Sequence, residues 1–326
     1  MKRSWLFVGV SLLGLALMGT GCAKPPPPPT PITVQLAWTH QAQFAGFYAA
    51  DQKGQYATEG LAVTFMEGGS DVDKLAAVLD GSAQFGVAGA DELILARAAG
   101  QPVRAITTIY RRSPVVFISL AEKGITRPQQ FVGKTIRTAD NVAPTLRAIT
   151  AFVGITPDQY TAIELPSDVA SFASGEVPVW GVYINSIVVA IQRAGYKINV
   201  IYPDDYGVHF YADTLFTTDD LIATHSDLVE RFLRATLKGW TYTVENPEAV
   251  PALVQKVNPD ADLAVEYDRM IASLPLVNTG EDHIGWMKAE VWASMEQTLR
   301  EQGVLIPPLD VTQVYTMQFL QEIYGQ

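Results

Sequence analysis

Cysteine is nearly absent from this sequence: Cys22 is the only one in 326 residues. A lone cysteine forms no intrachain disulfide and no cysteine-based zinc site, and the chain after Cys22 has no cysteine nucleophile. Histidine is scarce as well, and its four copies are too widely separated in sequence to give a local metal-ligand spacing: His40, His209, His225 and His283. We therefore predict no metal site and no resident cofactor.

Positive charge is also in short supply. Lysine and arginine total 23 against 34 acidic residues, a formal net charge of −11, and no basic stripe occurs. This balance argues against a nucleic acid as partner. The sequence has no Walker-type phosphate loop, no H-E-x-x-H and no G-x-S-x-G motif. We therefore predict that the protein is not an enzyme.

The N-terminus has the pattern of an export signal. Lys2 and Arg3 precede an apolar stretch over residues 6–18, and Gly19-Thr20-Gly21-Cys22 follows. This order is typical of a bacterial lipoprotein, with a signal peptide over residues 1–21 and a lipid on Cys22. A plain secretory peptide or a membrane anchor is the alternative, although the stretch is short for a spanning helix. We expect an anchor on the extracytoplasmic side of the cell membrane.

A proline-rich segment over residues 22–31 follows, with a run of five prolines, Pro25 to Pro29. Such a run adopts polyproline II and extends about 3.1 Å per residue. We expect it to act as a tether that holds the folded body roughly 20–30 Å from the lipid surface.

The remaining sequence alternates between strand and helix patterns. Strands are predicted over residues 33–37, 61–66, 84–88 and 103–110, with helices over 46–56, 72–79 and 91–99 between them. The rhythm restarts at residues 115–120, a short helix is predicted over 169–173, and long amphipathic patterns follow residue 221. This organisation predicts an α/β protein with two α/β lobes joined by a two-crossing hinge. Lobe one would comprise residues 32–112 plus 213–326, and lobe two residues 113–212.

Ligands of such sheets bind beyond the carboxyl ends of the strands. The first strand leads into Trp38, His40, Gln41 and Gln43, with Tyr48 in the next helix. An indole there can stack on a flat ligand, but core packing of Trp38 and helix capping by the polar residues are alternatives. The further candidate ligand contacts lie at later strand ends and at the second crossing: Asp91, Tyr183, Asn185, Tyr206 and Tyr211.

Three segments carry a family resemblance. They are "LAWTHQAQFAGFYAADQKGQYATEGLAV" with the "GGSD" after it, "GKTI" at residues 133–136, and "DYGVHFYADTLFTT" at residues 205–218. Together they resemble the SsuA/thiamine-pyrimidine-synthase-like group of solute-binding lipoproteins of ABC importers. The resemblance implies the type II periplasmic-binding-protein fold. It also implies delivery of a small heteroaromatic ligand to an ABC permease and its ATPase.

Members of this group bind thiamine pyrimidine precursors, riboflavin or alkyl sulfonates. Pyrimidine binders tend to begin W-T-P-N-x-x-H, whereas this chain has His40, Gln41 and Phe44 at the three variable places. That departure, with the lobe-two aromatics, favours a larger flat ring and therefore riboflavin. Hydroxymethylpyrimidine or formylaminopyrimidine is the alternative, and a sulfonate the next. Synthases of the group use a histidine and pyridoxal phosphate and carry a cysteine-rich motif, which is missing here.

Overall fold

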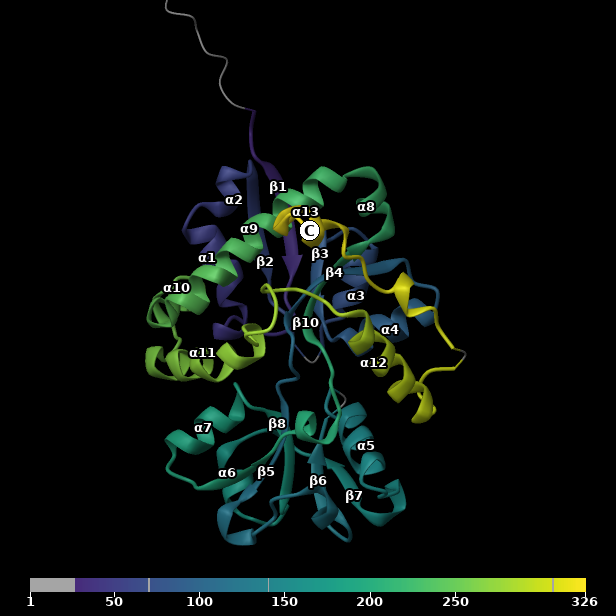
Figure 1. The fold of residues 1–326 in the computed structure, drawn as a ribbon. Coiled ribbons are helices and arrows are strands. Elements are labelled where there is room, and N and C mark those ends of the chain that lie inside the picture. Colours follow the sequence, from purple (N-terminus) through teal and green to yellow (C-terminus); the bar gives the residue numbers. More distant parts are fainter. Residues whose placement is uncertain (1–26, 70, 140, 307) are drawn as a thin grey trace, which may run out of the picture.

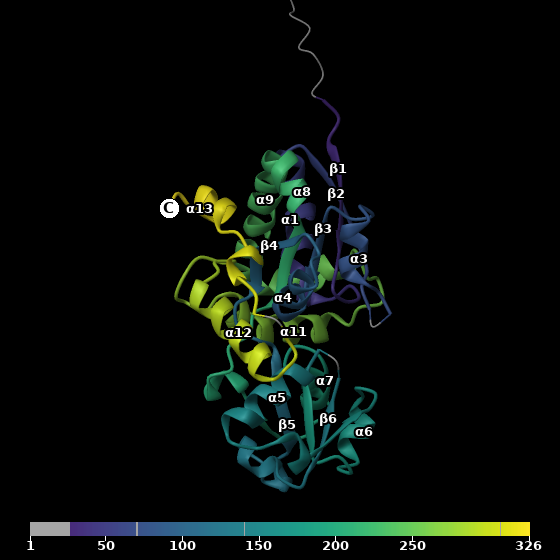
Figure 2. The same cartoon turned by 90° about the vertical axis from the view of Figure 1, so that its right-hand side faces the viewer.

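The computed structural model of the chain describes residues 27–326 apart from residues 70, 140 and 307. Within them, the chain forms two α/β lobes, one above the other in Figures 1 and 2. The predicted signal peptide and Cys22 lie outside the described residues. In both views the first described residues leave lobe one at the end far from lobe two.

The sheet of lobe one has the strand order β2-β1-β3-β10-β4. β1 runs parallel to β2 and β3, whereas β10 is antiparallel to β3 and β4. The bounds of these strands are β1 Thr30–Gln35, β2 Leu61–Met66, β3 Phe85–Ala88, β4 Val103–Tyr110 and β10 Ala212–Thr218.

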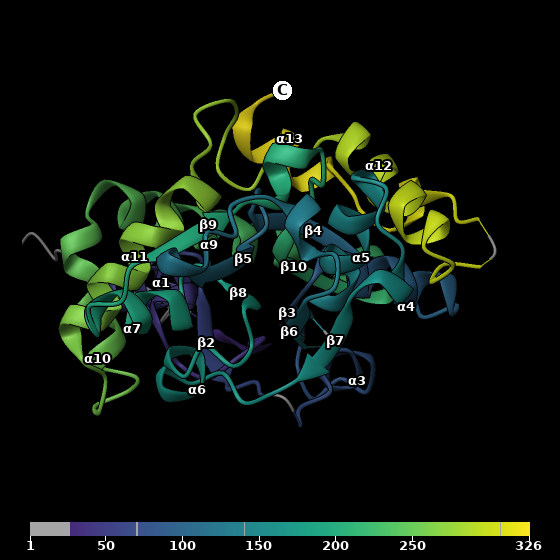
Figure 3. The ribbon, with the colours of Figure 1, turned by 90° about the horizontal axis from the view of Figure 1, so that it is seen from below.

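The sheet of lobe two repeats this arrangement in the order β7-β6-β8-β5-β9. β6 is parallel to β7 and β8, and β5 is antiparallel to β8 and β9. Seen from below, α5 covers one side of this sheet and α6 and α7 the other (Figure 3). The bounds are β5 Val115–Leu120, β6 Thr135–Thr138, β7 Thr161–Glu164, β8 Val179–Tyr183, β9 Ile198–Ile201, α5 Ala143–Phe152, α6 Val169–Ala173 and α7 Ile187–Arg193.

The C-terminal part of the chain adds helices to lobe one, which is therefore the larger lobe (Figure 1). α1 and α9 approach so closely that a Cβ on Gly239 would lie 2.1 Å from the Gly46 carbonyl oxygen, so both helices need glycine where they cross. The helices of lobe one are α1 Ala45–Gln52, α2 Gln55–Thr58, α3 Lys74–Leu79, α4 Ala90–Ala98, α8 Asp219–Thr224, α9 Ser226–Glu245, α10 Val250–Gln255, α11 Leu263–Val277, α12 Ala289–Glu301 and α13 Gln318–Tyr324.

The chain passes between the lobes over residues 111–114 and 202–211. The carboxylate of Asp204 joins these two passages, because it accepts a hydrogen bond from Arg112 Nε at 2.8 Å and is 2.7 Å from His209 Nδ1. The lobes also touch beside the hinge, where Arg193 of α7 and Asp268 of α11 form an ion pair at 2.6 Å. No helix of the described residues is both long enough and apolar enough to cross a membrane.

The element boundaries differ from the predictions in a few places. The helix predicted over residues 46–56 is split, because Gly54 adopts a left-handed φ of 72° between α1 and α2. β1 begins at Thr30, so Thr30 and Pro31 belong to the sheet and not to the tether. Proline is tolerated there because β1 pairs with β3 only from Val34 onward. The sequence reading also missed β10, which it treated as part of the second crossing.

Candidate functional site

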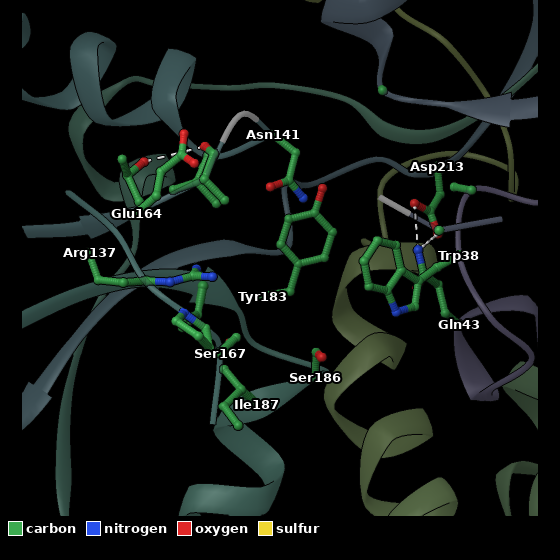
Figure 4. A pocket seen from close by; sticks show the side chains of 18 of the residues that line it. Trp38, Gln43, Arg137, Asn141, Glu164, Ser167, Tyr183, Ser186, Ile187 and Asp213 are labelled. Carbon is green, nitrogen blue, oxygen red and sulfur yellow. Dashed lines mark hydrogen bonds between the residues drawn. The ribbon is translucent and has the colours of Figure 1, made fainter. Parts of the chain in front are cut away.

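A cavity of about 850 Å³ lies between the two lobes. Its walls are the loops that follow β1, β2 and β3 of lobe one and β6, β7 and β8 of lobe two. Figure 4 shows Trp38, Gln43 and Asp213 on the lobe-one side, Arg137, Glu164 and Ser167 on the opposite side, and Tyr183 between them. This volume is within the range of small-molecule sites, about 300–1,000 Å³.

The loop that carries Trp38 is fastened to lobe one on both of its sides. Gly68 N donates to the Trp38 carbonyl at 3.1 Å, and the Glu67 carboxylate accepts from His40 N at 2.8 Å. From the far end of the chain, the buried Glu266 of α11 accepts from Ala42 N at 2.6 Å. Trp38 itself is 44% exposed and lines the cavity. The indole is therefore presented to the cavity on a rigid loop.

Three side chains of lobe one form a chain of hydrogen bonds at the cavity wall. Gln41 Nε2 donates to Gln43 Oε1 at 2.7 Å, and Gln43 Nε2 donates to both carboxylate oxygens of Asp213 at 2.8 and 3.0 Å. These bonds fix both amides, so the Gln41 Oε1 atom remains as the acceptor at the outer end.

Asp213 is buried and has a positive φ of 46°, which is uncommon for a residue other than glycine. Burial raises the pKa of its carboxyl to about 7, and the hydrogen bond from Gln43 opposes that rise. A strained backbone and a buried acid at one point are typical of functional sites.

The first turn of α4 places Glu92 at the lobe-one wall, whereas its neighbour Asp91 is not among the described lining residues. Glu92 Oε1 accepts from Gly89 N at 3.1 Å, and Glu92 Oε2 pairs with Lys74 Nζ at 2.9 Å. Asp91 packs against Gly89, where a Cβ would lie 2.4 Å from Asp91 Oδ1. Burial is the main reason that the pKa of Asp91 rises to about 6.

Arg137, at the end of β6, is the cationic group of the lobe-two wall. Its side chain is held from behind: Nε donates to the Leu165 carbonyl at 3.1 Å, Nη1 donates to the Gly181 carbonyl at 2.9 Å, and the guanidinium lies 5.8 Å from the Trp180 ring centroid. Arg137 is only 8% exposed, and no carboxylate of the described residues lies within ion-pair distance. Burial lowers its pKa, and the charge of Glu164 opposes that shift.

Tyr183 supplies the aromatic surface of the lobe-two wall. It ends β8 and lines the cavity, and Figure 4 shows its hydroxyl beside the Asn141 side chain. Figure 4 shows the Tyr183 ring in the space between Trp38 and Arg137. Burial raises the pKa of Tyr183 well above its ordinary value, so the hydroxyl stays protonated at neutral pH.

The structure gathers part of the predicted site at this cavity. Trp38, Gln41, Gln43 and Tyr183 all line it. Among the described lining residues, the other predicted contacts are not present. His40 turns its Nδ1 toward the Tyr48 hydroxyl at 2.8 Å, and Tyr48 is fully buried in the core of lobe one.

The hinge-side candidates have structural partners in place of a ligand. Asn185 Nδ2 donates to the Tyr110 hydroxyl and to Ser273 Oγ, both at 2.9 Å, in a buried cluster between β8, β4 and α11. Tyr211 packs edge-on against Trp292, and its hydroxyl accepts from Lys288 N at 2.9 Å. Tyr206 is partly buried against the core. These three predicted contacts are therefore corrected: Asn185 and Tyr211 bond to protein groups, and Tyr206 packs against the core, so none of them is among the described lining residues.

Arg137, Glu164 and Asp213 are cavity residues that the sequence reading did not select. Arg137 is the second-last residue of β6 and Glu164 is the last residue of β7, and this position at a strand's carboxyl end was the available signal. Asp213 gave no such signal, since β10 was not expected as a strand. In the part of the chain that the structure describes, no group of three or more His, Cys, Asp or Glu side chains is arranged to hold a metal ion.

The sequence matches a known protein family and is similar to named binding proteins. Residues 41–250 match the profile of the family described as NMT1/THI5 like. The chain is 27% identical over 349 aligned residues to the riboflavin-binding protein RibY of Chloroflexus aurantiacus, covering 98% of both chains. It is 25% identical to the formylaminopyrimidine-binding protein of Halalkalibacterium halodurans, covering 92% of this chain and 94% of that protein.

The chain is also similar to a synthase in sequence and to a solved binding protein in structure. The 4-amino-5-hydroxymethyl-2-methylpyrimidine phosphate synthase of Legionella pneumophila is 24% identical, covering 89% of this chain and 92% of that protein. The periplasmic aliphatic sulphonate binding protein SsuA of Escherichia coli superposes with a TM-score of 0.69 at 16% identity, covering 88% of this chain and 92% of that chain. The fold is therefore that of the type II periplasmic binding proteins, as predicted.

Proposed function

Since this chain belongs to the NMT1/THI5-like family, we propose that it is a solute-binding protein that captures a flat, neutral heteroaromatic ligand, with riboflavin as the first candidate. The observation that carries the proposal is the inter-lobe cavity with one aromatic side chain from each lobe, Trp38 and Tyr183. Aromatic rings on two walls stack on a planar ligand at low entropic cost.

The charges around the cavity favour a neutral ligand over an anionic one. Of the lining residues that the structure describes, three are acidic, Glu92, Glu164 and Asp213, and two are cationic, Lys74 and Arg137. Because Lys74 is already paired with Glu92, Arg137 is the one described cation of the lining that is available to a ligand anion. This balance disfavours a sulfonate, which a binding site must compensate with cationic or N–H donors.

The size of the cavity supports riboflavin over a pyrimidine precursor. A single pyrimidine ring would leave most of the 850 Å³ to water. The tricyclic ring and long tail of riboflavin fill more of that space and bury more apolar area. The relatives named for riboflavin and for formylaminopyrimidine are compatible with either ligand, so the two must be compared by experiment.

The position of His40 supports a binding role over a synthase role. A synthase in which His40 is a reactant would need its ring at the ligand, yet Nδ1 faces the Tyr48 hydroxyl at 2.8 Å and the ring packs edge-on against that tyrosine. Burial lowers the pKa of His40, which keeps the ring neutral. This arrangement stabilises the loop that carries Trp38 and turns the His40 ring away from the cavity.

Delivery would follow from hinge closure. The two chain passages at residues 111–114 and 202–211 allow the lobes to close on the ligand, and tighter binding in the closed state would drive that closure. The closed protein would dock on an ABC permease, which its ATPase powers. A lipid on Cys22, with the proline tether behind it, would keep the protein at the extracytoplasmic face of the cell membrane.

A titration tests the proposal. The purified full chain is titrated with riboflavin while flavin fluorescence and binding heat are followed. We expect saturable quenching with a Kd in the micromolar range or tighter, because stacking on Trp38 quenches the flavin. Formylaminopyrimidine, hydroxymethylpyrimidine and an alkanesulfonate are then added as competitors. Binding of a pyrimidine without any binding of riboflavin would overturn the proposed ligand.

A further inference from the structure

We propose that the lobe-two end of the cavity, formed by Arg137, Ser167 and Glu164, is a separate subsite for an uncharged, hydroxylated tail on the ligand's ring. We further propose that it discriminates against a phosphate on that tail. This inference rests on the proposed function, because it assumes that a flat ring occupies the space beside Trp38 and Tyr183.

Arg137 has spare hydrogen-bonding capacity. Two of its nitrogens are bound to backbone carbonyls, Nε to Leu165 and Nη1 to Gly181. No hydrogen bond from Nη2 to another described residue occurs, although the side chain is 8% exposed and lines the cavity. Nη2 is not among the described buried side-chain atoms that lack a partner, so it is accessible to water, and an acceptor on a ligand can take the place of that water.

Glu164 and Ser167 complement the hydrogen-bonding chemistry of Arg137. Glu164 ends β7 beside Thr138 of β6, and its charge acts on Arg137 without forming an ion pair. Within the described chain, neither the Glu164 carboxylate nor the Ser167 hydroxyl has a hydrogen-bond partner. Arg137 only donates, Glu164 only accepts and Ser167 does both. A chain of hydroxyl groups, each a donor and an acceptor, satisfies all three.

Arg137, Ser167 and Glu164 lie apart from the place proposed for the ligand's ring. In Figure 4 the Tyr183 ring separates Arg137, Ser167 and Glu164 from Trp38, Gln43 and Asp213. A ring stacked between Trp38 and Tyr183 therefore leaves the Arg137 end for a substituent. The ribityl tail of riboflavin is such a substituent: flexible, uncharged and hydroxylated.

The charges at this end of the cavity disfavour a phosphate on the tail. A phosphate on the tail would place a dianion beside the Glu164 carboxylate, with one guanidinium to compensate it. Arg137 is the only cationic side chain of the described lining residues that lacks an acidic partner, since Lys74 is paired with Glu92. A site built for phosphate ordinarily supplies several donors or cations and no carboxylate. The subsite thus selects the free alcohol over its phosphate ester.

The test compares three flavins on the full chain: riboflavin, lumiflavin, which lacks the tail, and riboflavin 5′-phosphate. We expect riboflavin to bind at least about 10-fold tighter than lumiflavin, as hydrogen bonds to a charged donor allow. Arg137→Gln should remove most of that preference and leave lumiflavin affinity unchanged. Ser167→Ala, at an exposed position that tolerates substitution, should lower riboflavin affinity by about 2- to 10-fold without affecting lumiflavin.

Glu164→Gln tests the discrimination. It should raise affinity for riboflavin 5′-phosphate by about 5- to 50-fold, because it removes the like charge, and change riboflavin affinity much less. Arg127→Gln and Glu176→Gln are the charge-matched controls, since both positions are exposed in lobe two and outside the described cavity lining.

Each outcome has a separate meaning. Equal binding of riboflavin and lumiflavin, or equal losses for both in Arg137→Gln and Ser167→Ala, overturns the tail subsite and leaves the proposed function standing. Preference for riboflavin 5′-phosphate over riboflavin overturns the discrimination against phosphate. Failure of all three flavins to bind overturns the proposed function, and the subsite with it.

Discussion

The two walls of the cavity differ in how their polar groups are satisfied. On lobe one, Gln41, Gln43 and Asp213 bond to one another, and Lys74 pairs with Glu92. On lobe two, Arg137 retains a donor, and Glu164 and Ser167 have no partner within the described chain. A preformed wall loses little freedom on binding, whereas the exposed Glu164 and Ser167 exchange hydrogen bonds with water for hydrogen bonds with a ligand.

This difference suggests a division of labour between the lobes. The rigid lobe-one wall would set the position of the ring. The lobe-two wall would form hydrogen bonds to the tail when the lobes close, and these bonds would stabilise the closed state. Differential affinity of this kind is what shifts a hinged protein toward its closed state.

Asp213→Asn should have the largest effect, on stability and its pH dependence. The folded-state pKa of Asp213 is raised to about 7 from 3.8, so the folded protein binds a proton more readily than the unfolded chain, and stability falls as pH rises through that window. Asparagine tolerates the positive φ and never ionises. Its advantage over the parent protein should grow by about 3 kcal/mol between about pH 5 and about pH 8.

Urea unfolding of both proteins at the two pH values measures this difference. An advantage that stays constant with pH would show that Asp213 is ionised throughout and that the lobe-one wall carries a permanent charge.

Gly68→Ala should displace the lip of lobe one. A Cβ at this position would lie 2.3 Å from the Leu36 carbonyl oxygen and 2.6 Å from Trp38 N, both backbone atoms. The loop must shift, which should cost about 1–3 kcal/mol of stability and lower riboflavin affinity at least about 10-fold. Thermal unfolding and calorimetric titration check both.

Gly124→Ala is the control for a general loss of stability. Gly124 lies on lobe two with φ +63°, and a Cβ added to it would meet nothing within 4 Å. Alanine there should therefore strain the backbone without moving either wall of the cavity. Similar affinity losses in both variants would remove the role of the Gly68 contact.

Trp38→Ala should lower riboflavin affinity by about 10- to 100-fold with little change in stability, because the indole is 44% exposed and would stack on the proposed ligand. Tyr196→Ala is the matched control: this ring is 40% exposed, lies outside both chain passages between the lobes and is not among the described lining residues. Titration of both variants by calorimetry makes the comparison. Unchanged affinity in Trp38→Ala would mean that the ligand stacks on Tyr183 and not on Trp38.

The ion pair between Arg193 and Asp268 should have the smallest effect. It joins α7 of lobe two to α11 of lobe one at 2.6 Å, with both side chains about 40% exposed. Exposed pairs contribute about 0.2–1 kcal/mol and are screened by salt. A double-mutant cycle with alanine at both positions should give a coupling within that range. A much larger coupling would make this contact a determinant of lobe closure.

Much of the architecture could be predicted from local sequence. β2, β4, β5 and α6 have the predicted boundaries, since each is an apolar run or helical pattern with a turn residue beside it. β10 was missed because it lies after a segment rich in aspartate and tyrosine, and because its antiparallel place between β3 and β4 depends on the chain's return from lobe two. Long-range pairing of this kind leaves no local pattern.

The class of this protein follows from local sequence features: the strand–helix alternation and two crossings, the scarcity of cysteine, and Trp38, Gln41 and Gln43 directly after a strand. Which polar groups face the cavity depends on the packing of the two lobes. Tyr48 and Tyr211 are aromatic in sequence but are covered by neighbouring elements, while Arg137 and Asp213 come from separate parts of the chain and meet across one space. Burial and proximity depend on how distant segments pack, so a residue's role at the cavity arises only when both lobes are formed.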